Sequence, residues 1–189
     1  MFTLREPSAC DVAEFLFSQS KLSFSYRDVG ASNSTPPAGY TIDHNRIQLG
    51  SGRKVYERAV QALKQWRQFD LGWVTILPPG VPIEVGATVA VKARACGLWS
   101  LNACRVVYVV DEPERFGFAY GTLPDHVERG EERFLVEWRP EDETVWFDIL
   151  AFSRPQHLLA KAGFVVARRL QKRFAREAMA IMRSVLQEQ

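Results

Sequence analysis

The spacing of apolar residues changes twice along the chain and divides it into three regions. Between residues 53 and 68, apolar residues recur every three to four positions, which predicts an amphipathic helix. Between 73 and 152 the spacing falls to two, or to short apolar runs, as is typical of β-strands. From 156 to 186 the helical spacing returns, which predicts a long helix opened by Pro155.

The middle region predicts six strands joined by short turns. The candidate strands are Trp73–Leu77, Thr88–Cys96, Leu101–Val110, Phe116–Thr122, Glu131–Trp138 and Thr144–Phe152. The segments between them, such as PPGVP and RPEDE, are rich in turn-forming residues. Because parallel pairing needs crossovers of about a dozen residues or more, these short connections favour an antiparallel meander.

The first part of the chain predicts a helix, a loop and one further strand. Ser8 to Asp11 resembles a capping box and begins a helix over about 8–20. Residues 23–39 are rich in Ser, Asn, Gly and Pro, which indicates a loop. Residues 40–49 have an extended pattern. We interpret 1–39 as part of the same unit as a single domain over 40–189.

This order of elements predicts an α+β fold. It matches the helix-grip, or START-like, architecture, in which a curved antiparallel sheet of about seven strands grips a long C-terminal helix, here with an extra N-terminal helix. The space between sheet and helix is commonly a ligand cavity in such proteins. Other α+β folds can have the same order, so the order alone does not define a function.

The segment Gly50-Ser51-Gly52-Arg53-Lys54 raises the question of a phosphate-binding loop. A dinucleotide fingerprint would need a third glycine where Val55 stands, and a P-loop would need Lys followed by Ser or Thr after the second glycine. We predict a tight strand-to-helix turn in which the glycines adopt unusual backbone angles. Anion binding at the helix N-terminus is the alternative.

Composition narrows the possible functions. The 189 residues carry a net charge of +2, which is no footprint for nucleic acid, and 47% of them are hydrophobic. No apolar run approaches the roughly 20 residues that span a bilayer, and the first residues lack the apolar region of a signal peptide. The three cysteines and three histidines lack metal-ligand spacing. We therefore expect a cytoplasmic protein without metal, cofactor or nucleic-acid partner.

Several segments between Tyr40 and the C-terminus occur in an order that is similar to a known family. They read YTIDHNRIQLGSG, QWRQFDLGWV, LWSLNACRVVYVVDE, RFGFAYGTLPDHVERGEERFLVEW, VWFDILAFSRPQHLLAKAG and RRLQKRFAREAM. The chain resembles the bacterial and plant family catalogued as domain of unknown function 1990. This resemblance implies a single domain and supplies no catalytic residues.

Two predicted strands carry a charge on an apolar face. One face of the strand over 131–138 carries Glu132, Phe134, Val136 and Trp138. Glu132 is either a cavity acid or base with a raised pKa, or a strand-end carboxylate paired with a cation. Arg105 shares a face with Leu101, Ala103, Val107 and Val109. It either anchors an anionic ligand group or forms a buried bridge to Glu132 or Asp148.

Four further residues are candidates. Glu177 falls inside the apolar stripe of the C-terminal helix, where it either faces the cavity or pairs with Arg173 at the edge of the stripe. Tyr120 can donate a hydrogen bond to a ligand, or it belongs to the core. His126, in a polar turn, is either a proton carrier or an ordinary surface histidine.

We expect a protein that binds a small apolar or amphipathic ligand between the sheet and the C-terminal helix. The expected ligand contacts are Arg105, Glu132, Tyr120, Trp138, Arg173 and Glu177. One alternative is an enzyme of cyclase, dehydratase or hydrolase type that uses Glu132 or His126 in the same cavity. Another is weak contact with anionic surfaces through the basic face of the helix. That face carries Lys161, Arg168, Arg169, Lys172, Arg176 and Arg183.

Overall fold

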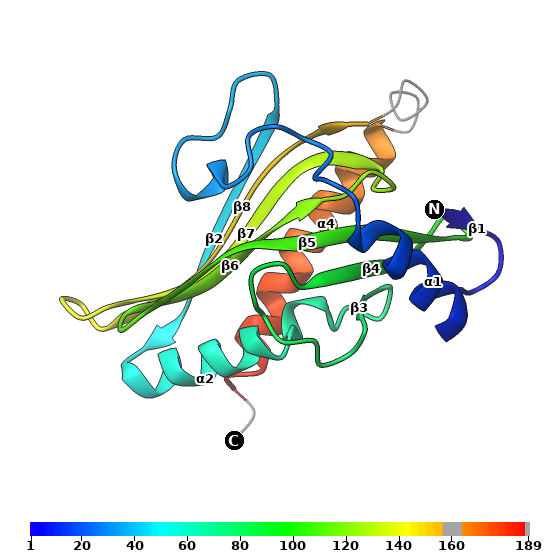
Figure 1. Ribbon diagram of the computed structural model, residues 1–189. Helices are drawn as coiled ribbons and strands as arrows, with labels where there is room; N and C mark the ends of the chain where they lie inside the picture. The colour runs from blue at the N-terminus through cyan, green and yellow to red at the C-terminus, as the bar shows by residue number, and fades with distance from the viewer. Residues whose placement is uncertain (157–163, 188–189) are drawn as a thin grey trace.

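The protein is built on one antiparallel sheet, seen in a computed structural model that describes residues 1–156 and 164–187 (Figure 1). The strands are β1 (Phe2–Thr3), β2 (Thr41–Ser51), β3 (Val74–Leu77), β4 (Thr88–Ala95), β5 (Leu98–Glu112), β6 (Arg115–Thr122), β7 (Glu128–Arg139) and β8 (Thr144–Pro155). Their order across the sheet is β2-β8-β7-β6-β5-β4-β3, and β1 pairs with β5. Consecutive strands from β3 to β8 are neighbours, which confirms the predicted meander.

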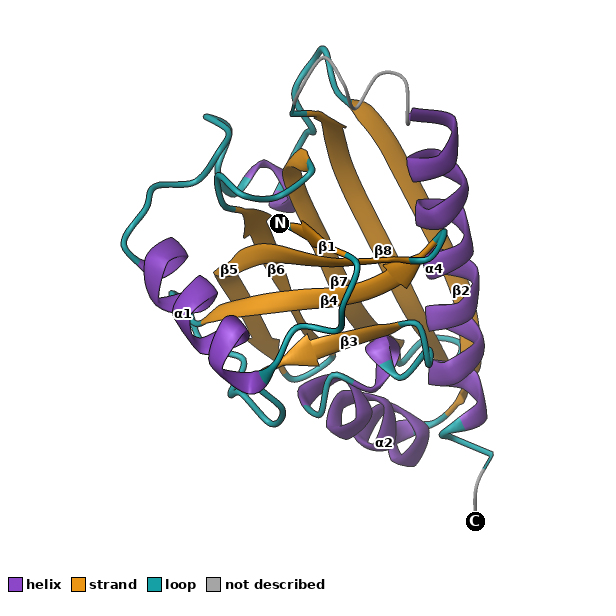
Figure 2. Ribbon diagram, turned by 90° about the vertical axis from the view of Figure 1, so that its right-hand side faces the viewer, coloured by secondary structure: helices purple, strands orange, loops and turns teal. Residues whose placement is uncertain are grey.

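Helices cover both faces of this sheet. They are α1 (Ala9–Ser20), α2 (Arg53–Lys64) and α4 (Phe164–Ser184), with short 3₁₀ helices η1 (Ala31–Asn33) and η2 (Arg67–Phe69). Helices α2 and α4 lie on the inner face of the curved sheet, where α4 runs beside β8 and β2 (Figure 2). Helix α1 packs on the outer face of β4 and β5 through a separate apolar cluster. The predicted α+β class, with a curved antiparallel sheet and a C-terminal helix, is confirmed.

The start of α1 follows the predicted capping box. The Asp11 backbone N–H donates to Ser8 Oγ (3.2 Å), and the Ser8 N–H donates to the Asp11 carboxylate (2.8 Å). Two otherwise unpaired backbone donors are thus satisfied at the N-terminus of the helix. Val12 and Phe15 then face the sheet and are buried.

The Gly-Ser-Gly segment is the predicted strand-to-helix turn. Strand β2 ends at Ser51, α2 begins at Arg53, and Gly52 between them has φ of +87°. Gly50 has φ of +156° and follows a β-bulge at which the register with β8 shifts. Both angles are disfavoured for residues with a side chain, which explains the two glycines.

Two helix boundaries differ from the prediction. Helix α2 ends at Lys64 rather than at 68, because Trp66 adopts a left-handed conformation with φ of 58°. Its indole N–H donates to the Val81 carbonyl (2.9 Å), and η2 follows. Pro155 does not open the C-terminal helix but is the last residue of β8. The beginning of that predicted helix, at 157–163, lies outside the described residues.

The loop between α1 and β2 is held on the outer face by the buried carboxylate of Glu131. That carboxylate accepts hydrogen bonds from Tyr26 Oη (2.6 Å), Gly30 N (2.7 Å) and Ser32 N (3.0 Å), and from the Ser32 hydroxyl. Ser32 Oγ also lies 2.7 Å from Tyr108 Oη. One side chain of β7 therefore satisfies the donors of a loop about a hundred positions earlier.

Candidate functional site

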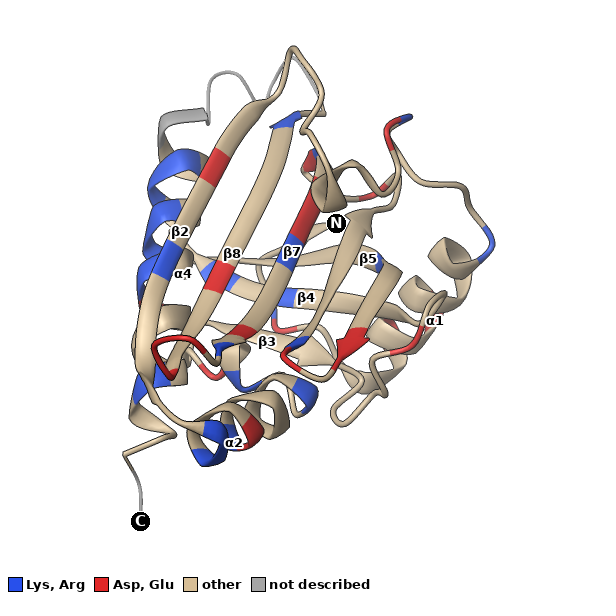
Figure 3. Ribbon diagram, turned by 90° about the vertical axis from the view of Figure 1, so that its left-hand side faces the viewer, with Lys and Arg blue, Asp and Glu red and all other residues tan. Residues whose placement is uncertain are grey.

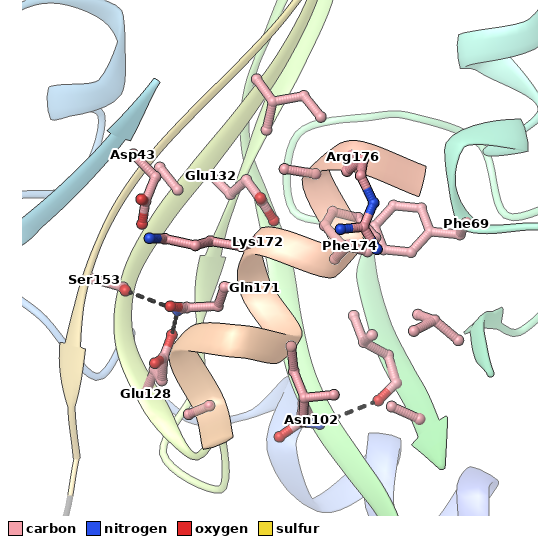
Figure 4. A pocket seen from close by; sticks show the side chains of 18 of the residues that line it. Asp43, Phe69, Asn102, Glu128, Glu132, Ser153, Gln171, Lys172, Phe174 and Arg176 are labelled. Atoms are coloured by element: carbon pink, nitrogen blue, oxygen red, sulfur yellow. Dashed lines mark hydrogen bonds between the residues drawn. The ribbon is translucent and has the colours of Figure 1, made fainter. Parts of the chain in front are cut away.

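A cavity of about 1680 Å³ lies between the inner face of the sheet and α4 (Figure 4). Much of its wall is apolar. The large apolar side chains that line it include Phe69, Trp73, Ile149, Leu170, Phe174 and Met179. They come from η2 and its following loop, from β8 and from α4. The left-handed turn at Trp66 therefore matters for the site, because it precedes the η2 segment that carries Phe69 to the cavity.

A carboxyl–phenol pair lies on the sheet side of the cavity. Glu132 on β7 and Tyr120 on β6 are direct cross-strand neighbours, and Tyr120 Oη donates to Glu132 Oε2 at 2.7 Å. Burial raises the pKa of Glu132 to about 7, although the hydrogen bond from Tyr120 lowers that pKa in part. Glu132 remains partly open to the cavity. The pair can therefore gain or lose a proton near neutral pH in contact with a bound molecule.

Asn102 on β5 contributes a second polar group to the cavity. Its side chain is fixed by donation from Nδ2 to Ser100 Oγ (3.1 Å) and to the Val91 carbonyl (3.4 Å). The residue is only 7% exposed. Its Oδ1 has no hydrogen-bond partner within the part of the chain that the structure describes. A buried amide oxygen without a partner is costly, but this atom is enclosed by the protein and does not itself face the cavity.

One end of the cavity is closed by a polar network between α4 and the sheet. Gln171 Nε2 donates to Ser153 Oγ (3.2 Å) and to the Glu128 carboxylate (Figure 4). Arg168 forms a bidentate ion pair with Asp43 on β2, with one contact of 2.7 Å. Burial raises the pKa of Glu128. These bonds fix the position of α4 over β2, β7 and β8.

His126 lines the same cavity and is half-buried rather than freely exposed. Its Nδ1 lies 3.0 Å from the backbone N–H of Glu128, from which it accepts a hydrogen bond. Burial lowers the pKa of His126 to about 4, so the ring is neutral at neutral pH. Among the described residues, no hydrogen bond or ion pair joins His126 to Glu132.

The structure does not bring Arg105 to the cavity. Its Nη2 donates to the carbonyl oxygens of Ser20 (2.8 Å) and Gln19 (3.4 Å) at the end of α1, on the outer face of the sheet. The expected bridges to Glu132 or Asp148 are not formed, because Glu132 accepts from Tyr120 and Asp148 pairs with Arg133 (2.8 Å). The arginine instead complements the negative end of a helix dipole.

Replacement of Arg105 by methionine is expected to leave ligand binding unchanged and to cost about 1–2 kcal/mol of stability, since α1 loses a cation at its C-terminus. Urea unfolding measures this cost. The matched control is Arg94→Met, which removes an exposed arginine. A loss of affinity for a cavity probe without a loss of stability would contradict this structural role.

The three other expected contacts lie away from the cavity wall. Trp138 packs against α2, where its ring stacks on Tyr56 with a centroid distance of 6.2 Å. Arg173 and Glu177 form the predicted pair within α4 (2.8 Å), and Glu177 also accepts from the Trp73 indole N–H (2.7 Å). Both lie at the rim beside Trp73, so this pair supports the wall rather than forming it.

The basic face of α4 is divided between one paired and several exposed side chains. Arg168 forms an ion pair with Asp43. The exposed members are Arg169, Lys172, Arg176 and Arg183. Figure 3 shows basic segments along the length of α4. Lys161 lies outside the described residues.

The sequence prediction does not identify Asn102, Phe69 and Trp73 as cavity residues, and it does not identify Glu131 as the residue that holds the loop between α1 and β2. Asn102 does carry a signal, because it is a polar residue that shares a strand face with the buried Cys104. Phe69 and Trp73 carry no such signal, because the turn that directs them to the cavity depends on how Trp66 packs. Of the expected contacts, Glu132 and Tyr120 are brought together on the cavity wall.

The fold and the cavity define the class of protein: an α+β protein in which a curved antiparallel sheet and a C-terminal helix enclose a largely apolar space. The chain belongs to the family described as domain of unknown function DUF1990, whose profile matches residues 25–181. A UPF0548 protein of Dictyostelium discoideum is 34% identical over 195 residues, covering 92% of this chain and 90% of that protein. A UPF0548 protein of Deinococcus radiodurans is 41% identical over 167 residues, covering 82% and 83%.

Solved structures share the fold at low sequence identity. A hypothetical protein of Helicobacter pylori has a TM-score of 0.57 at 9% identity, covering 86% of this chain and 95% of that one. A protein of Thermus thermophilus has a TM-score of 0.53 at 13% identity, covering 77% and 97%. These likenesses establish the fold alone. Within the described ranges, no helix is long and apolar enough to cross a membrane.

Proposed function

We propose that this protein binds a small apolar or amphipathic molecule in the cavity between the sheet and α4, as a helix-grip, START-like binding protein. One observation carries the proposal: a space of about 1680 Å³ has largely apolar walls and a few convergent polar groups, Glu132, Tyr120 and Asn102. Ligand sites typically combine these features in about 300–1,000 Å³. The larger volume here leaves room for a bulky or flexible molecule.

Filling part of the cavity should weaken binding. Ala151 lines it and is the cross-strand neighbour of Glu132. In the variant Ala151→Phe, the ring should occupy the space beside Glu132. We expect the affinity for the apolar fluorophore N-phenyl-1-naphthylamine to fall about tenfold or more, equivalent to ~1.4 kcal/mol. Fluorescence titration of both proteins measures this change.

The matched control is Ala13→Phe, which adds the same ring to an exposed position of α1. It should bind the fluorophore as the wild type does. Equal affinity of Ala151→Phe and wild type would reject the cavity as the binding site, provided that both proteins are folded by circular dichroism. The same would follow if the wild type bound no fluorophore.

Acid–base catalysis at Glu132 is a second candidate function. It is favoured by the 2.7 Å contact with Tyr120 and by the raised pKa of Glu132, which allows proton exchange near neutral pH. Glu132 would be the general acid or base of a cyclase, dehydratase or hydrolase. Native mass spectrometry should then find different molecules bound to wild type and to Glu132→Gln, since the variant would retain unreacted substrate. Identical bound masses would argue for binding alone.

Two further expectations from the sequence are kept as proposals. Weak contact with anionic surfaces is supported by the exposed basic residues of α4, among them Arg169 and Arg183. A cytoplasmic location rests on the sequence alone.

A further inference from the structure

We propose that the cavity selects an amphipathic amine, whose ammonium group pairs with the Glu132 carboxylate and lies against aromatic rings of the same wall. This inference rests on the proposed binding function and specifies its ligand class. It follows from a carboxylate that faces the cavity without a cation beside it.

Glu132 presents one free carboxylate oxygen to the cavity. Its Oε2 accepts the hydrogen bond from Tyr120 (2.7 Å), and its Oε1 has no partner among the described residues. Unlike Asn102 Oδ1, Oε1 is not enclosed by the protein, and Glu132 lines the cavity. In Figure 4 the carboxylate of Glu132 points from its strand toward α4. A bound molecule can therefore reach this oxygen.

The neighbouring carboxylates have partners, whereas Glu132 lacks a cation. Asp43 pairs with Arg168, and Glu128 accepts from Gln171. Within the described part of the chain, Glu132 takes part in no ion pair. The charged groups that act most on its pKa are Glu128 and Asp43, and both raise it. An ammonium group would supply the missing positive charge, and Glu132 is already desolvated by folding.

Aromatic rings lie beside this carboxylate. Tyr120 is bonded to it directly, the centroid of the Phe69 ring lies 6.2 Å from that of Tyr120, and the Phe174 ring lies 5.1 Å from Phe69. All three residues line the cavity. The faces of aromatic rings attract ammonium groups within about 6 Å. A carboxylate next to such rings therefore suits a cation better than it suits a neutral hydroxyl.

His126 is a further polar group of the wall with an atom left for a ligand. The Glu128 N–H and carbonyl lie 3.0 and 3.1 Å from its Nδ1, so either tautomer leaves Nε2 unpartnered among the described residues. The ring is neutral at neutral pH, because burial lowers its pKa to about 4. If Nε2 carries the proton, it can donate to an anion, but that anion would share the cavity with the negative charge of Glu132.

The cations that line the described cavity are exposed or paired. Arg46 pairs with Glu137, and the exposed cations on α4 are Lys172, Arg176 and Arg183. Water and salt screen the exposed charges, which weakens both their attraction for an anion and their repulsion of a cation. Glu132 is more enclosed, so its charge is screened less. We therefore expect Glu132 to decide the charge of the ligand.

A matched series of ten-carbon probes tests this preference in the wild-type protein. Decylammonium is a cation, decan-1-ol is neutral and decanoate is an anion. Competition with N-phenyl-1-naphthylamine at about pH 8, where most Glu132 is ionised, gives each affinity. We expect decylammonium to bind about tenfold more tightly than the other two probes. Equal or tighter binding of decan-1-ol would overturn the inference, and so would tighter binding of decanoate, which would point to His126 or the exposed cations.

The variant Glu132→Gln tests the residue itself. Glutamine has a similar shape without the charge, so the preference for decylammonium over decan-1-ol should fall to about onefold. Glu141→Gln, at an exposed position, should keep the preference. A preference that survives in Glu132→Gln would exclude this carboxylate as the partner of the ammonium group.

The pH dependence in the wild type tests the same pairing without a substitution. Because the pKa of Glu132 is about 7, its ionised fraction rises between about pH 6 and about pH 8, while decylammonium stays protonated. The affinity for decylammonium relative to decan-1-ol should therefore rise about fivefold or more. Any part that comes from Glu128 would persist in Glu132→Gln. A ratio that stays constant or falls would contradict the pairing.

The failure of this inference is distinguishable from failure of the proposed function. If N-phenyl-1-naphthylamine binds the wild type and binds Ala151→Phe less tightly, but the probes show no preference for the amine, the cavity binds ligands without the selectivity inferred here. If neither the fluorophore nor any probe binds the wild type, both proposals fail.

Discussion

Replacement of Glu131 by alanine is expected to lower the free energy of unfolding by about 3–5 kcal/mol, because it leaves several buried donors without an acceptor at about 1–3 kcal/mol each. These donors are Tyr26 Oη, Gly30 N and Ser32 N, with the Ser32 hydroxyl beside them. Glu131 is 3% exposed, so water cannot readily replace the lost carboxylate. The loop that contains η1 should detach from the outer face before the sheet unfolds.

Urea unfolding of Glu131→Ala and wild type measures the loss, and hydrogen exchange at Gly30 and Ser32 measures the release of the loop. The control is Glu141→Ala, which removes an exposed carboxylate from the turn between β7 and β8 and should change stability by less than about 0.5 kcal/mol. A cost below about 1 kcal/mol for Glu131→Ala would mean that the loop is held mainly by other contacts.

The adjacent residues Glu131 and Glu132 show what the alternation along a strand can and cannot predict. Alternation along β7 correctly separates the two carboxylates to opposite faces, and it identifies Glu132 as an anomaly on an apolar face. Glu131 carries no such signal, because its partners belong to a loop that precedes it by about a hundred positions. Periodicity reports which face a side chain occupies, but it does not report what covers that face.

Trp138 illustrates the same limit along a strand. It shares the inner face of β7 with Glu132, yet α2 covers that end of the face and the cavity lies at the other end. The prediction for Arg105 is wrong because the apolar face that it shares with Leu101 and Ala103 is the outer face, which packs against α1 rather than facing the cavity. A β-bulge between Val106 and Tyr108 also breaks the alternation farther along β5, and nothing in the local sequence marks it.

The strands are predicted well because short turns and period-two spacing are both local properties of the chain. The ends of elements are predicted less well where distant contacts decide them. Strand β5 begins at Leu98, which the sequence assigns to a turn, because its first residues pair with β4 and with β1. The short β1 has only two residues, which is too few for a periodic signal.

The titration of Glu132 should make the stability of the protein depend on pH in an unusual direction. Its pKa rises from an ordinary value of 4.5 to about 7 in the folded state, chiefly through burial. The folded protein therefore binds this proton more tightly than the unfolded chain does. The resulting stabilisation is fully present below about pH 4.5 and is lost as pH rises through about 7, by up to about 3 kcal/mol at ~1.4 kcal/mol per pH unit.

Glutamine at position 132 has a similar shape and no titrating proton. The difference in unfolding free energy between Glu132→Gln and wild type should therefore shift in favour of the variant by up to about 3 kcal/mol between about pH 4 and about pH 8. Taking this difference removes the titration of other groups, such as Glu128 and His126. Glu141→Gln, at an exposed position, should show no such shift. A difference that is constant across this range would mean that Glu132 titrates as an ordinary carboxyl group.

The variant Tyr120→Phe identifies the cause of the shift. The hydrogen bond from Tyr120 stabilises the ionised carboxylate and so lowers the pKa of Glu132, while burial raises it. Removal of the hydroxyl should therefore raise the pKa of Glu132. The loss of stability should then extend to higher pH, and the NMR resonance of the Glu132 carboxyl group should titrate at a higher pH than in wild type. A shift to lower pH would mean that water entering where the hydroxyl had been solvates the carboxylate better than Tyr120 did, and the burial argument for a raised pKa would then fail.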